Sequence, residues 1–89
     1  MAKLKSRRAL LAVLRSVMPS GIEPTCEIES AGRPSVYKTG WKAEFCGGTY
    51  GNFFSHEGLP DEAMARKFGE ILTINCGMAR EKMEGARDG

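Results

Sequence analysis

The first segment of the chain has apolar residues at helical spacing. Between Ser6 and Met18 the large apolar side chains gather on one face, at Leu10, Leu11, Leu14, Val17 and Met18. Ser6 has the side chain of a helix N-cap, and Pro19-Ser20-Gly21 predicts the end of the helix. This interpretation leaves residues 1–5 as a flexible basic arm.

Three following segments alternate between apolar and polar residues, as half-buried strands do. The first spans 25–30, the second lies within 35–46 and the third spans 49–54, with a hairpin at Gly47-Gly48 joining the last two. Gly40 predicts a bulge or bend in the second strand. One face of that strand carries Tyr37, Thr39, Trp41, Ala43 and Phe45. We expect this aromatic stripe to form the core; the alternative is a platform that stacks nucleobases.

A second helix is predicted from Pro60 onward. Proline is typical of the first turn of a helix, and Asp61 and Glu62 complement the helix dipole there. Asn75 falls on the apolar stripe, and Gly77 lowers helix propensity. We therefore expect a bend or an end near Gly77 and a frayed tail over 84–89. The stripe itself consists of Met64, Phe68, Ile71, Leu72, Met78, Ala79 and Met83.

The predicted order is helix, three antiparallel strands, helix. A three-stranded meander has one apolar face, which two amphipathic helices can cover. The sequence therefore predicts one α+β domain over residues 1–89, with both helices packed on one sheet face. Double-stranded-RNA-binding domains share this order but carry a lysine cluster at the start of the second helix. The acidic Asp61-Glu62 stands there in this chain, so it is not assigned to that family.

Charge is distributed unevenly along the chain. The net charge is +2, but residues 1–19 hold five cations and no acid, which leaves a net charge of −3 elsewhere. Cations at a helix start oppose the helix dipole, but this cost is modest if Ser6 is the N-cap. The charge asymmetry makes this segment the best candidate for binding an acidic partner. The alternative is a solvated arm without a partner. The candidate partner-binding residues are Lys3, Lys5, Arg7, Arg8 and Arg15, assisted by Arg33, Lys38 and Lys42 on the sheet.

No catalytic or metal-binding constellation is evident in the sequence. His56 is the only histidine, and we place it in a loop after the third strand, where neighbouring side chains point apart. Cys26, Cys46 and Cys76 form no Cys-x-x-Cys motif, which argues against a zinc site and against a disulfide framework. We expect three reduced cysteines, no metal and no cofactor.

The run from Ala9 to Leu14 is short for a signal-peptide core, and Arg15 interrupts it. No segment approaches the length of a membrane span. We expect a cytoplasmic protein; a helix that lies on a membrane surface is the alternative.

These observations favour a small non-enzymatic binding or regulatory protein that docks onto another macromolecule. One version is a phage-type inhibitor or adaptor of a nucleic-acid-handling protein complex, with a surface that mimics or binds nucleic acid. A protein is the expected partner, and direct RNA or DNA binding through the basic N-terminal helix is the alternative. A third hypothesis is a homodimer through the second helix, whose methionines Met64, Met78 and Met83 suit adaptable interfaces.

Overall fold

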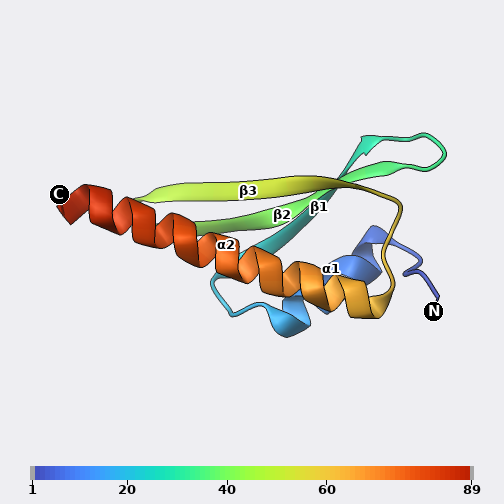
Figure 1. Cartoon of the computed structure of the whole chain (residues 1–89), viewed down its shortest axis with the longest axis horizontal. Helices are drawn as coiled ribbons and strands as arrows, with labels where there is room; N and C mark the ends of the chain where they lie inside the picture. Colours follow the sequence, from blue (N-terminus) through green and yellow to red (C-terminus); the bar gives the residue numbers. More distant parts are fainter. Residues whose placement is uncertain (1, 89) are drawn as a thin grey trace.

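The computed structural model of the chain describes residues 2–88, and the side chains of residues 2–86. Met1 of the expected arm and Gly89 of the expected tail lie outside the described residues. The elements are α1 (Arg7–Val17), β1 (Ile22–Ser30), β2 (Val36–Phe45), β3 (Gly48–Glu57) and α2 (Glu62–Asp88). The strands form one antiparallel sheet in the order β1-β2-β3, and both helices contact it from the same side (Figure 1). The predicted α+β fold is confirmed.

Helix α1 begins and ends where its sequence indicates. The Ser6 hydroxyl oxygen accepts a hydrogen bond from the Ala9 N–H at 3.0 Å, as an N-cap does. Leu10 and Leu14 are fully buried against the sheet and α2. At the other end the Met18 N–H donates to the Leu14 carbonyl at 2.9 Å, and Gly21 turns the chain toward β1 with a φ of +95°.

The segment before α1 is anchored, where a free arm was expected. The Leu4 N–H donates to the Pro60 carbonyl at 2.8 Å, and Lys3 forms an isolated antiparallel bridge with Asp61. Backbone groups of a loop next to a packed helix need hydrogen-bond partners, and the extended arm supplies them to the loop before α2. The N-terminal cations therefore start from a fixed position.

The inner sheet face holds the core, as the alternation predicts. Thr39, Trp41 and Ala43 of β2 are buried there, and Phe54 of β3 packs edge-to-face on Phe68 of α2 with ring centroids 4.9 Å apart. By contrast, Phe53 lies on the outer face and is 56% exposed.

The strands differ from the prediction in their bounds and in the position of the bulge. β1 begins at Ile22 instead of residue 25, and β3 spans Gly48–Glu57 instead of 49–54. Residue 40 sits in continuous register, and a Cβ there would overlap the Asn52 carbonyl oxygen and lie 2.7 Å from the Phe53 Cα. Gly40 is thus required for a close approach of β2 and β3, not for a bulge. The register shift occurs in β1 instead, between Ile28 and Ser30.

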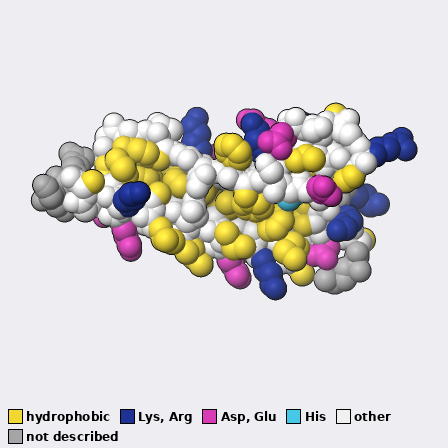
Figure 2. All heavy atoms as spheres, turned by 45° about the horizontal axis from the view of Figure 1, so that its top comes forward, with side chains coloured by type: hydrophobic (Ala, Val, Ile, Leu, Met, Phe, Trp, Pro, Cys, Tyr) yellow, Lys and Arg dark blue, Asp and Glu magenta, His cyan; other side chains and the backbone are white. Residues whose placement is uncertain are grey.

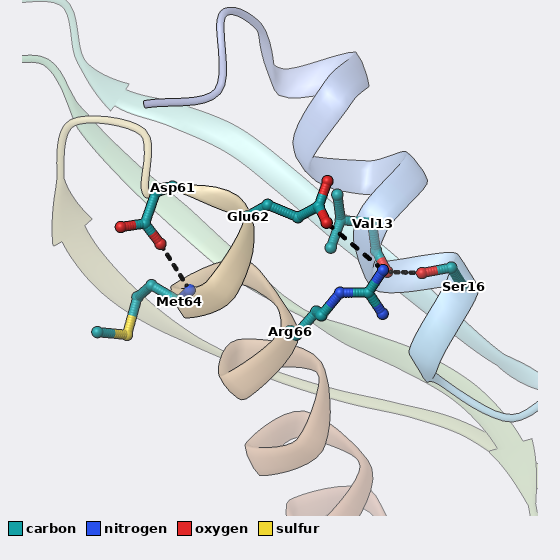
Figure 3. A network of polar contacts seen from close by, with 6 residues as sticks. All are labelled: Val13, Ser16, Asp61, Glu62, Met64 and Arg66. Atoms are coloured by element: carbon teal, nitrogen blue, oxygen red, sulfur yellow. Dashed lines mark hydrogen bonds and ion pairs between the residues drawn. The ribbon is translucent and has the colours of Figure 1, made fainter. Parts of the chain in front are cut away.

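Helix α2 runs unbroken past Gly77. Its N-cap is Asp61, whose carboxylate accepts a hydrogen bond from the Met64 N–H at 2.8 Å (Figure 3), so Pro60 precedes the cap and is not in the first turn. Asn75 occupies the apolar stripe because its side-chain oxygen accepts hydrogen bonds from Trp41 Nε1 at 2.8 Å and from Asn52 Nδ2 at 3.1 Å. The hydrogen bonds of this amide join α2 to both β2 and β3.

Candidate interaction surfaces

The eight basic residues expected at a partner site do not share one surface. Arg15 forms an ion pair with Glu23 at 2.8 Å, and the Arg7 guanidinium donates to the Cys26 carbonyl at 3.4 Å. Both contacts join α1 to β1. These two arginines therefore contribute to the packing of the fold.

Lys38 and Lys42 lie on the outer sheet face, which no helix covers. In the register of the sheet they stand opposite Glu27 and Glu23 of β1, and the Lys38 ammonium lies 5.0 Å from the centroid of the Phe53 ring. Opposite charges on neighbouring strands cancel much of the field that a polyanion would meet. The outer face is consequently mixed in charge.

Lys3 and Arg33 lie at the end of the molecule that holds both the N-terminal segment and the β1–β2 loop (Figure 1). Both line a hollow of about 590 Å³ between the anchored arm, the β1–β2 loop and the end of β3. Lys5 and Arg8 follow on the chain and are exposed. The remaining lining residues are Leu4, Gly32, Pro34, Ser35, Tyr37, Glu57, Gly58 and Leu59.

A second surface is apolar and runs along α2. Met64, Ile71, Ile74 and Met78 are between 45% and 63% exposed, and Met64 projects away from α1 (Figure 3). Figure 2 shows hydrophobic side chains gathered in a band on this side of the molecule. The band borders a groove of about 710 Å³ whose lining includes Trp41, Tyr50, Asn75, Met78 and Met83.

His56 belongs to β3, not to a loop, and it lies on the inner face. Its Nδ1–H donates to the Gly58 carbonyl at 2.9 Å, and its Nε2 forms a hydrogen bond with the Thr39 hydroxyl. Thr39 is fully buried and also contacts the Cys26 sulfur at 3.6 Å. These side chains form a polar row across the three strands. The polar residues around His56 predicted a loop, but β3 continues through them, with successive side chains on opposite faces of the sheet.

The cysteines are free thiols. Cys26 and Cys76 are buried, and burial raises the pKa of each thiol because it disfavours the charged thiolate. A nucleophilic cysteine needs the opposite shift. Cys26 and Cys76 therefore act as small core residues, whereas Cys46 occupies the β2–β3 turn with a φ of +50°.

No protein-family model matches the chain, and comparisons with curated proteins and with solved structures find no significant similarity. Within the described part of the chain, no three His, Cys, Asp or Glu side chains gather closely enough to hold a metal ion. Over the same residues, neither helix is long and apolar enough to cross a membrane. The surfaces described above are thus the basis for a functional proposal.

Proposed function

We propose that the chain is a non-enzymatic binding protein that docks onto an acidic surface of another protein through the basic hollow. The observation that carries this proposal is the position of Lys3 and Arg33 on one hollow with apolar lining. The backbone contacts of Leu4 and Lys3 with the loop before α2 hold the arm in place. A pre-positioned cation loses less freedom on binding than a cation on a flexible arm.

The chemistry of the hollow favours a protein segment with acidic and apolar side chains. Leu4, Tyr37 and Leu59 are half-buried and offer apolar contact area, while Lys3 and Arg33 offer charge at the rim. Glu57, which also lines the hollow, would select against an acid placed beside it. Burial of one apolar side chain together with two ion pairs is a recognition mode of protein segments.

Direct nucleic-acid binding is less well supported. A protein that follows a phosphate backbone needs a continuous basic track. Here Arg7 and Arg15 are engaged by β1, and the lysines of the outer sheet face stand beside acids. The cations that remain exposed near the hollow are few.

A charge-reversal capture experiment tests the proposal. The tagged protein, K3E/R33E and K38E/K42E are each used as bait in extracts of the organism that encodes the chain, with and without nuclease. The second double variant is a matched control, because it reverses the same number of charges on the outer face. We expect the wild type and K38E/K42E to retain the same protein partner after nuclease treatment, and K3E/R33E to lose it.

The loss of affinity expected for K3E/R33E can also be estimated. Two exposed ion pairs contribute up to about 1 kcal/mol each, so the double reversal should weaken the purified complex about tenfold or more. Equal capture by both double variants would remove the hollow from the contact surface. Capture that nuclease abolishes, with affinity that falls steeply as salt rises, would favour the nucleic-acid alternative instead.

A further inference from the structure

Strand β3 presents a regular free edge. The turn Cys46–Gly47, with φ values of +50° and +74°, closes the hairpin at the Phe45–Gly48 pair. The closing pair of such a turn is hydrogen-bonded, and the pairs alternate from there. The outward backbone groups therefore belong to Thr49, Gly51, Phe53, Ser55 and Glu57, with Phe53 at the centre. The bond from the Gly58 N–H to the Ser35 carbonyl fits this alternation.

One row of α2 side chains follows a repeat of three and four residues. It holds the exposed apolar Met64, Ile71, Ile74 and Met78, and the charged Lys67 and Glu81 occupy its other two positions. Such spacing is typical of the seam between two packed helices. The centre of the row lies between Ile71 and Ile74, and Lys67 and Glu81 lie on either side of it.

The two features lie at the same level of the molecule. Asn75 of α2 contacts Asn52, and Phe68 contacts Phe54, so the part of the helix near residue 71 lies above Phe53. The helix also contacts Trp41 of β2, so its side chains reach both β2 and β3. One symmetry axis can therefore pass through the centre of the strand edge and the centre of the helical row.

From these positions we infer that β3 and α2 form the interface of an isologous homodimer with a continuous six-stranded sheet. This inference is independent of the proposed docking at the hollow. A two-fold axis beside the β3 edge and perpendicular to the sheet leaves both α2 helices on the same side of the joined sheet, antiparallel to each other.

The charges and the groove complement each other across this axis. An antiparallel pair places Ile71 on the partner's Ile74 and Lys67 on the partner's Met78, with the partner's Glu81 three residues further along, whereas a parallel pair would place like charges together. Met64 would lie opposite the partner's Glu81, at the groove that Met78 and Met83 line. A flexible thioether fills such a groove well. Pairing of the β3 edges replaces the bond that the Phe53 N–H now donates to its neighbour Asn52 at 2.9 Å.

Sedimentation equilibrium of the purified full chain tests the inference. We expect a species of about 19.4 kDa, twice the chain mass of 9.7 kDa, at micromolar concentration. Ile74→Glu should shift it to the monomer, because it buries unpaired charge at the centre of the helical seam. Ser55→Pro should weaken the dimer about tenfold or more, because it removes an outward edge N–H without removing a bond between β2 and β3.

Two controls make the result specific. Ile28→Glu introduces the same charge at a 46% exposed position of β1 and should leave the dimer intact. Lys67→Glu should weaken the dimer, and K67E/E81K should restore it, because the double variant exchanges the signs across the axis. A monomeric wild type, or a dimer that tolerates both Ile74→Glu and Ser55→Pro, overturns the inference. Neither result bears on Lys3 and Arg33, so the docking proposal is judged separately.

Discussion

The two edges of this three-stranded sheet are built differently. At the β1 edge Pro24 has no N–H to offer, the Arg7 guanidinium occupies the Cys26 carbonyl, and the register shifts between Ile28 and Ser30. At the β3 edge ten residues run in unbroken register without a proline. Prolines, covering side chains and bulges are the means by which proteins prevent strand addition.

This difference indicates at which edge of the sheet another strand could pair. A second strand beside β1 would meet a missing donor and an occupied acceptor. The β3 edge keeps the full alternation of outward donors and acceptors, although the Phe53 N–H there donates to the Asn52 side chain and would have to exchange that bond. The apolar row of α2 adjoins the β3 edge. The edge that is open for pairing is thus also the one next to exposed apolar area.

Gly40→Val should have the largest effect. The added side chain overlaps the β3 backbone, so it should destabilise the pairing of β2 with β3 and leave β1 untouched. The Cβ would collide with the Asn52 carbonyl oxygen and the Phe53 Cα. We expect the free energy of unfolding to fall by about 3 kcal/mol or more. Urea denaturation measures the loss, and hydrogen exchange should show lower protection in β3 than in β1.

Gly77→Ala serves as the control for that experiment. A Cβ at residue 77 meets nothing within 4 Å, so alanine should stabilise α2 by up to about 1 kcal/mol. If the Gly40→Val variant unfolds at the same urea concentration as the wild type, β2 and β3 do not approach each other as closely as described.

Arg7→Met should uncover the β1 edge at a smaller cost. The substitution removes the donor to the Cys26 carbonyl while keeping an apolar side chain of similar length. We expect a loss of about 1 kcal/mol in the free energy of unfolding. Arg8→Met removes the same charge from an exposed neighbour and should change stability by less than about 0.5 kcal/mol. Equal losses for the two variants would mean that the guanidinium does not cover the edge.

The smallest effect concerns the cysteines. The folded pKa of Cys26 and of Cys76 is raised above the ordinary value of 9.0, so the unfolded chain ionises first as pH rises. The stability they contribute is complete below that value and is lost at higher pH. Urea unfolding at neutral and alkaline pH should therefore show a small drop that C26A/C76A lacks. Iodoacetamide should modify Cys46 before either buried thiol, and the reverse order would contradict their burial.

Local signals were enough to predict much of the fold. Alternation placed Thr39 and Trp41 on the inner face, and the side chain of Ser6 predicted the N-cap that the structure has. Both signals act within a few residues, so a single sequence displays them. The beginning of β1 at Ile22 was missed because Pro24 resembles a loop residue until the free edge is known.

Features that depend on contacts between distant segments could not be predicted. The anchoring of the arm requires Leu4 to meet Pro60, and the role of Asn75 requires Trp41 and Asn52 to lie beneath it. The basic residues illustrate the same limit. Nothing in their spacing indicated that Lys3 and Arg33 would line one hollow while Lys38 faces the opposite side of the sheet.

The packing of α1 on α2 has a consequence for synthesis of the chain. A Cβ on Gly69 would overlap the Val17 side chain, so α1 lies directly on α2 at this point. The hairpins of the sheet join near neighbours in sequence, but α1 obtains this partner only after more than fifty further residues have been translated. Leu10 and Leu14, which are fully buried in the finished fold, therefore leave the ribosome long before the helix that completes their enclosure.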